Sequence, residues 1–233
     1  MAKKVFIAPG HGGTDPGAVA NGFKEKDLNL TISLACKAEL ERHGVSVSMS
    51  RSKDESETLS QQVNECNAFL GSDGLAINIH NNAGGGDGAE VYYYSGGGTS
   101  KVLADNILAE VVAIGQNSRG AKIKKNAQGT DYYGWIRQTY APAVIVECAF
   151  LDNAKDIQII DTVEEQKAMG IAIAKGALKT LGIAYVPEVN KTETVDVSKY
   201  EKEIKSLKEE NKSLKNEVSA LKSKIENAKV ALQ

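Results

Sequence analysis

The sequence predicts an α/β fold, a mostly parallel twisted sheet with helices on both faces, followed by a C-terminal coiled-coil helix. Two observations carry this prediction. Short segments rich in β-branched residues alternate with helical patterns in the first four fifths of the chain. From Val197 onwards, apolar residues recur instead at alternating steps of three and four. A chain of 233 residues therefore reads as one globular domain with an appendage.

The expected strands are short runs with β-branched residues, and the expected helices have apolar residues three or four positions apart. In chain order the strands are Val5 to Ala8, Val45 to Ser48, Leu75 to Ile79, Ala89 to Tyr94 and Ala143 to Val146. The helices are Asp27 to Arg42, Glu57 to Phe69, Ser100 to Ile114 and Glu164 to Leu181. Gly44 is suited to end the first helix. The alternation of the two patterns favours parallel strands joined by helices.

Composition excludes several classes of protein. Hydrophobic residues make up 42% and charged residues 25%, as in ordinary soluble domains, and the formal net charge of -2 gives no electrostatic case for binding nucleic acid. Cys36, Cys66 and Cys148 form no CxxC pair, so they are expected to be reduced, mostly buried thiols. The first apolar run, Val5 to Pro9, is too short for a secretory signal, and no run is long enough to span a membrane. We therefore expect synthesis in the cytoplasm without a signal peptide, and no membrane insertion.

The composition changes near Pro187, where aliphatic runs give way to Glu, Lys, Asn and Ser. We expect a globular domain over residues 1–185, a linker over 186–196 and a parallel, leucine-zipper-like coil over 197–233. The heptad a positions are Val197, Ile204, Asn211, Val218, Ile225 and Leu232, and the d positions are Tyr200, Leu207, Leu214, Leu221 and Ala228. The alternative is a lone solvated helix.

Features of the heptads favour a parallel homodimer over other assemblies. β-Branched residues at a with leucine at d favour two strands, and a single asparagine at an a position, Asn211, fixes their register. Three g-position glutamates each precede an e-position lysine by five residues, as pairing between parallel chains requires: Glu203 with Lys208, Glu210 with Lys215, and Glu217 with Lys222. The pair Lys224 and Lys229 breaks this rule.

Two histidines follow predicted strands. His11 comes directly after the first strand, within a run of glycines, and His80 comes directly after the third. Crevices form outside the carboxyl ends of strands in open α/β sheets, so these side chains can converge on a metal ion. A structural role at a strand end is the alternative for either histidine.

Two carboxylates can complete such a site. Glu147 ends the predicted strand Ala143 to Val146, and Glu25 lies just ahead of a helix. Taken alone, Glu147 fits equally well as an edge residue, and Glu25 fits better as a charge at a helix N-terminus. Two histidines and a carboxylate around an open position, with a second carboxylate for proton transfer, nevertheless make up a minimal catalytic zinc site.

Four motifs carry a family resemblance. The stretches 7–18, 25–30, 78–83 and 144–153, in this order, resemble the type 3 zinc N-acetylmuramoyl-L-alanine amidases of phage endolysins and bacterial autolysins. The resemblance spans about residues 4–182. It implies that His11, Glu25 and His80 hold Zn²⁺ and that Glu147 is the catalytic carboxylate. It also implies that the substrate is peptidoglycan, cut at the amide between N-acetylmuramic acid and L-alanine after release of the protein to the cell wall.

The same residues also allow other interpretations of the function. A wall-binding scaffold protein that keeps the fold would need no catalysis, and a zinc peptidase could cut within the peptide stem. A catalytic triad would have only His43 as its base, and that residue fits better as a helix C-terminal residue interacting with the helix dipole. Cys148 adjoins Glu147, but alternation along a strand would turn its side chain away from the site and into the core.

Overall fold

The computed structural model describes residues 3–188 and 197–231, and the chain divides into two compact units, Met1–Val186 and Pro187–Gln233. In chain order the strands are β1 (Lys4–Pro9), β2 (Val19–Ala20), β3 (Phe23–Lys24), β4 (Ser46–Met49), β5 (Leu75–Asn82), β6 (Ala89–Tyr93), β7 (Ser118–Lys122) and β8 (Ala143–Phe150). Six of them form one sheet in the order β4-β1-β5-β8-β6-β7, and β2 and β3 form a small antiparallel hairpin. All neighbours in the large sheet are parallel except β6 and β8.

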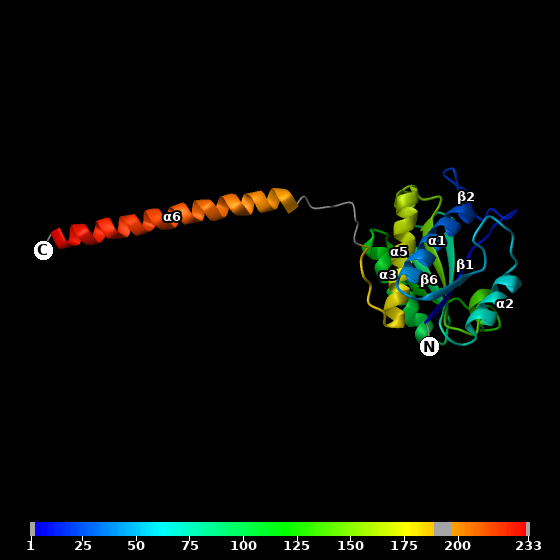
Figure 1. Ribbon diagram of the computed structural model, residues 1–233. Coiled ribbons are helices and arrows are strands. Elements are labelled where there is room, and N and C mark those ends of the chain that lie inside the picture. The colour runs from blue at the N-terminus through cyan, green and yellow to red at the C-terminus, as the bar shows by residue number, and fades with distance from the viewer. Residues whose placement is uncertain (1–2, 189–196, 232–233) are drawn as a thin grey trace. The chain divides into compact units, whose positions relative to one another are not determined.

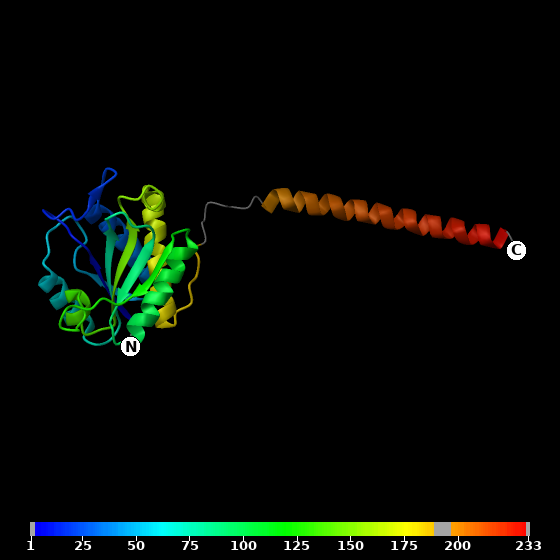
Figure 2. The same ribbon diagram turned by 180° about the vertical axis from the view of Figure 1, so that it is seen from behind.

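Helices cover both faces of the sheet (Figures 1 and 2). They are α1 (Glu25–Arg42), α2 (Leu59–Leu70), α3 (Thr99–Ala113), α4 (Gly134–Gln138) and α5 (Val163–Leu181), with a short 3-10 turn at Ile157–Ile159. Helices α1, α3 and α5 bury their apolar sides against one face in the larger core cluster, and α2 and α4 do so against the other face. The predicted architecture is thus confirmed.

Alternation along the strands assigns each side chain to one face. In β1, Val5 and Ile7 join the larger core cluster, whereas Phe6 and Ala8 join the smaller one beneath α2 and α4. All three cysteines are free and buried, with Cys148 in the larger cluster, as the sequence predicted. Thr58 and Thr162 close capping boxes at the starts of α2 and α5, so α2 starts two residues later and α5 one residue earlier than their apolar patterns indicated.

Several elements lie outside the sequence prediction. Strand β7 was not predicted, because its sequence Ser-Arg-Gly-Ala-Lys has neither β-branched residues nor apolar alternation and its pairing to β6 defines it. The hairpin β2-β3 and the five-residue helix α4 are similarly too short to leave a periodic pattern. The structure also corrects two strand ends, because β5 continues to Asn82 and β8 continues to Phe150. Their last residues pair with each other in the sheet.

The end of the globular unit is fixed against α1. The backbone N–H of Val186 donates to Nε2 of His43, and Arg42 donates to the carbonyl oxygen of Val186. The His43 ring stacks on Tyr185, and its Nδ1 lies 2.9 Å from the carbonyl oxygen of Glu39. His43 is therefore the C-cap residue of α1, at the helix C-terminus where the sequence placed it, and both of its ring nitrogens bind backbone groups.

The second unit contains one long helix, α6 (Val197–Ala231). The a and d side chains that are described are about half exposed or more: Ile204, Leu207, Leu214, Val218 and Leu221. Asn211 is exposed as well. The predicted linker lies largely outside the described residues, as does Leu232 with the side chains of Val197, Tyr200, Ile225 and Ala228. Within the described ranges, no helix is both long and apolar enough to cross a bilayer.

Candidate metal centre

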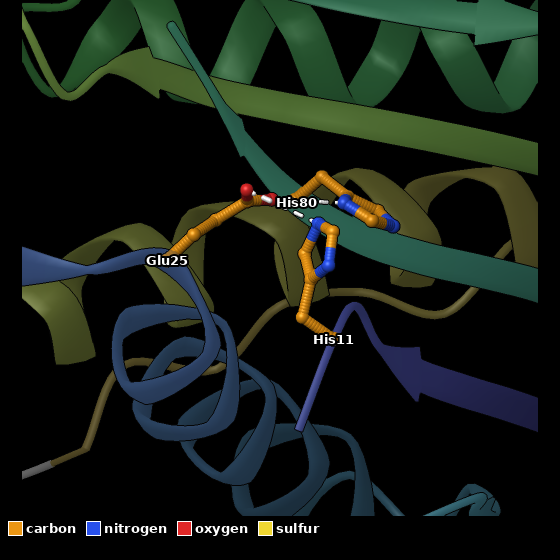
Figure 3. Close-up of side chains that lie close together, drawn as sticks. All are labelled: His11, Glu25 and His80. Carbon is orange, nitrogen blue, oxygen red and sulfur yellow. Dashed lines mark hydrogen bonds and ion pairs between the residues drawn. The ribbon is translucent and has the colours of Figure 1, made fainter. Parts of the chain in front are cut away.

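Three side chains from different elements meet at one edge of the sheet (Figure 3). His11 lies in the turn after β1, where its own φ is 60°; Glu25 is the first residue of α1; and His80 lies in β5. One ligand atom from each of the three lies within 4.8 Å of the others. The structure therefore brings together the three residues that the sequence singled out as metal ligands.

The donor set and its spacing fit a zinc ion. His11 Nε2 lies 3.1 Å from Oε2 of Glu25, and His80 Nδ1 lies 2.9 Å from Oε1 of the same carboxylate. Tetrahedral zinc with bonds of about 2.0–2.2 Å places its ligand atoms roughly 3.4 Å apart, which is close to these two distances, and the whole group lies within 4.8 Å. Two imidazole nitrogens with one carboxylate, leaving a position open, is a ligand set of catalytic zinc sites.

Each histidine has a partner at its other ring nitrogen. His11 Nδ1 lies 2.8 Å from Oδ2 of Asp15, and His80 Nε2 lies 3.1 Å from Oδ1 of Asn78. The amide nitrogen of Asn78 donates to the carbonyl oxygen of Ala8, which turns Oδ1 towards the ring. With a metal ion bound, these acceptors would keep the ring protons on the outer nitrogens and leave His11 Nε2 and His80 Nδ1 for the ion, as supporting partners of metal ligands do.

Glu25 is nearly buried and is held by several donors. Its carboxylate accepts hydrogen bonds from the side chain of Asn29 and from the backbone N–H groups of Ala18 and Asn81. Glycine is required beside it, because a Cβ at Gly17 would lie 2.6 Å from the Glu25 carboxylate in a backbone conformation with φ of 64°. The histidines and these backbone donors hold the pKa of Glu25 well below its usual value.

Arg51 supports the loops from beneath and is almost completely buried. Its guanidinium donates to the carbonyl oxygens of Pro9, Gly10 and Lys26, which flank the segments that carry His11 and Glu25. It therefore ties the turn after β1 to the first turn of α1. Sequence reasoning did not assign supporting roles to Arg51, Asp15 and Asn78, although the alternation in β5 places Asn78 on the same face as His80.

Glu147 lies beside this group rather than within it. It occupies β8 and pairs in register with His80 of β5, so both side chains rise from the same face. The expectation that these residues follow their strands was wrong, since both lie inside them. Burial raises the pKa of Glu147 to about 7, with a further contribution from the charges of Glu25 and Glu90. A carboxylate with such a pKa can take up and release a proton near neutral pH.

The His11 ring binds a proton that competes with a metal ion for the same nitrogen. The hydrogen bonds and charges of Glu25 and Asp15 raise the pKa of His11 to about 9, so its ring is protonated at neutral pH. A metal ion must displace that proton, because a ligating imidazole is neutral.

Zinc affinity is therefore expected to rise by about tenfold per pH unit from pH 6.5 towards pH 9, because each bound ion releases one proton from His11. Competition with a chromophoric chelator at several pH values measures this slope. Asp15→Asn removes one of the charges that raise the His11 pKa, so its slope should level off at a lower pH. A zinc affinity independent of pH over this range would contradict the expectation.

The family model and the relatives that this chain matches agree with one another. Residues 5–179 match the family model described as N-acetylmuramoyl-L-alanine amidase. The chain is 34% identical to the N-acetylmuramoyl-L-alanine amidase CwlM of Bacillus licheniformis, over 80% of this chain and 74% of that protein. It is 36% identical to the sporulation-specific N-acetylmuramoyl-L-alanine amidase of Bacillus subtilis, over 68% of this chain and 60% of that protein. Among solved structures, Cwp6 from Clostridium difficile is similar, with a TM-score of 0.75 and 35% identity over 78% of this chain and 30% of that chain.

Proposed function

The chain belongs to the N-acetylmuramoyl-L-alanine amidase family, and on that premise we propose that it hydrolyses the amide between N-acetylmuramic acid and L-alanine in the peptidoglycan of the cell wall with the help of one zinc ion. Catalysis is assigned to residues 1–185, followed by a linker over 186–196 and a coil over 197–233. The observation that carries the proposal is the convergence of His11, Glu25 and His80 beside Glu147.

In this proposal His11, Glu25 and His80 hold the metal. Zinc supplies Lewis-acid polarisation of the scissile carbonyl and lowers the pKa of water towards about 7. Asp15 and Asn78 keep the two imidazole rings oriented through their outer nitrogens. The hydrogen bonds to Glu25 hold its carboxylate ionised and in place before any metal arrives.

Glu147 is assigned the proton transfers. Its carboxylate removes a proton from the attacking water and returns it to the nitrogen of the departing L-alanine. Its raised pKa supports both steps, because a group with a pKa near the working pH is an effective base and, once protonated, an effective acid. Among the described residues, the other nucleophile considered, Cys148, is buried in the opposite core cluster, where burial raises the thiol pKa well above its usual value.

Digestion of purified peptidoglycan is expected to release peptides with free L-alanine amino termini and to create no new reducing sugar ends. Mass spectrometry of the products with and without a chelator measures both. Fragments cut within the peptide stem would identify a zinc peptidase instead. Specific binding to the wall without any release of amines, in protein shown to carry zinc, would identify a binding protein that keeps the fold.

We also propose that α6 pairs with α6 of a second copy as a parallel coiled coil. The support is the row of half-exposed apolar side chains at a and d positions, which a lone helix leaves in water. Asn211 sits among them at an a position, where its amide can pair with the same residue of the second chain.

The full chain is expected to elute as a dimer of about 50 kDa, twice its 24.9 kDa, whereas a truncation ending at Glu188 is expected to be an active monomer. Asn211→Leu should raise the melting temperature of the coil and loosen its oligomeric state, because a buried asparagine fixes two strands at a cost in stability. Size exclusion with light scattering measures each mass. A monomeric full-length chain at micromolar concentration would refute the coil.

A further inference from the structure

A row of polar side chains continues from the metal centre across the sheet. Antiparallel pairing of β6 and β8 places Glu90 opposite Glu147, which is itself opposite His80. Side chains opposite one another in neighbouring strands rise from the same face, so His80, Glu147 and Glu90 form one line. Beyond Glu90, the next strand is β7, which carries Arg119 and Lys122.

Glu90 is a buried carboxylate that fixes two cations. Arg119 Nε donates to Oε2 of Glu90 at 2.8 Å, and the ammonium group of Lys122 donates to the same oxygen. Asn82 and the hydroxyl of Tyr92 donate to its other oxygen. Two cations thus share one buried carboxylate, and Asp87 and Asp156 contribute further negative charge near Arg119.

Among the described residues, Arg119 has hydrogen-bond donors without an acceptor. Within the described residues, Arg119 uses Nε towards Glu90, and both guanidinium Nη groups are without a hydrogen-bond partner. Its guanidinium carbon lies 4.9 Å from the centre of the Phe150 ring, which limits how the group can turn. The side chains of Arg119 and Lys122 are 36% and 34% exposed. A planar anion can thus reach donors whose positions are already set by Glu90 and Phe150.

Charged side chains of both signs lie on either side of the metal centre. On the β1 side lie the carboxylates of Asp15, Asp54, Glu55 and Glu57, of which Asp54 pairs with Lys26 and Glu55 with Lys53. On the β7 side, Lys124 follows Lys122 and lies 4.2 Å from the ring centre of Tyr132, which adds a third positive charge. The guanidinium Nη groups of Arg119, rather than a difference in net charge, therefore attract an anionic group of the substrate to the β7 side.

We propose that Arg119 and Lys122 form a subsite for a free carboxylate of the peptide stem, with Glu90 as its positioning residue. The inference rests on the proposed function, because it places the stem on the β7 side of the bond that is cut. Neighbouring strands are about 4.8 Å apart, so from Glu147 to β7 is roughly 10 Å, and the Arg119 side chain spans part of that distance. A carboxylate one or two residues beyond L-alanine lies within this reach.

Two matched pairs of synthetic substrates separate the sources of that carboxylate. In peptidoglycan the second stem residue, D-glutamate, is joined through its γ-carboxyl, which leaves its α-carboxylate either free or amidated. We compare muramoyl tripeptides with L-lysine at the third position that differ only in this group. A second pair of substrates, amidated at residue two, differs by the presence or absence of a side-chain carboxylate at residue three.

In at least one of the two pairs, the native chain is expected to prefer the substrate with the carboxylate by about tenfold in kcat/KM, chiefly through KM, because charge-assisted hydrogen bonds are among the stronger kinds. Arg119→Gln and Lys122→Gln should each reduce that preference to less than about threefold and leave hydrolysis of the partner substrate within about threefold of native. Lys53→Gln, which removes the same charge on the β1 side, should keep the preference.

Substrate binding to Glu147→Gln, measured by calorimetry, separates this inference from the function on which it rests. A preference in Kd for the carboxylate substrate that disappears with Arg119→Gln supports the subsite even where no bond is cut. Equal kcat/KM and equal Kd within both substrate pairs would overturn it. So would a preference unchanged in both the Arg119 and Lys122 variants, provided that circular dichroism shows them folded.

Discussion

Glu147→Gln should lower kcat by about a hundredfold to ten-thousandfold while the protein keeps its zinc, because the amide can neither remove a proton from water nor deliver one to the leaving nitrogen. The substitution keeps the size of the side chain and its place in β8, in register with His80. Metal content by mass spectrometry and turnover on a muramoyl peptide are measured on the same sample. Near-native turnover in this variant would remove Glu147 from its assigned role.

Acid should inactivate the native chain through the same group. A base works only when ionised, and burial raises the pKa of Glu147 to about 7, so kcat/KM falls as pH drops through that value. A bound cation nearby moves the midpoint lower, since positive charge favours the carboxylate. Glu164→Gln, at an exposed position in α5, provides the control and should keep both the rate and the acid limb.

His80→Ala should lose both zinc and activity, with a fall in zinc affinity of more than about a hundredfold, which exceeds the loss that supporting residues of metal sites usually cause. His11→Ala should behave in the same way, because each variant leaves two ligands where three converge. Zinc retained after dialysis is measured by mass spectrometry. His43→Ala is the matched control, since that ring binds the backbone of Val186 and lies outside the ligand group.

Stoichiometric zinc in either His11→Ala or His80→Ala would refute the ligand assignment. A variant that unfolds would also lose zinc, so circular dichroism accompanies each measurement to show that the fold is kept. Asn78→Leu supplies an intermediate case, because it removes the acceptor at His80 Nε2 and keeps all three ligands. Its zinc affinity should fall by about tenfold to a hundredfold.

The sequence predicted the layered fold because its core strands carry strong local signals. Val5 to Ala8 and Ala143 to Val146 are apolar on both faces, as buried parallel strands are, and the amphipathic helices between them have clear periods. Strand β7 lacks such a signal because it lies at the sheet edge, where pairing with β6 defines it and its side chains are partly in water.

The ionisable residues near predicted strand ends indicated the candidate site, and the pairing of β5 with β8 determines where His80 and Glu147 lie. His80 looks terminal in sequence because two asparagines follow it, and Glu147 because it is a charged residue directly after an apolar run, although Cys148 to Leu151 are apolar again. In the sheet both strands continue, since the polar side chains face the metal centre while the backbone stays paired. Supporting residues such as Asp15 and Arg51 could not be predicted, because their roles depend on loop conformations that bring distant carbonyl and imidazole groups within reach.

The hydrogen bond between Val186 and His43 fixes the point at which a C-terminal module is attached to the globular unit. Glu25 begins α1 and His43 follows its end, so 18 residues of helix, about 27 Å, separate the proposed metal ligand from the residue that binds Val186. A segment joined after Val186 begins at a residue that is held against α1, at the opposite end of this helix from Glu25. A C-terminal module joined at this position is therefore attached about 27 Å along α1 from Glu25.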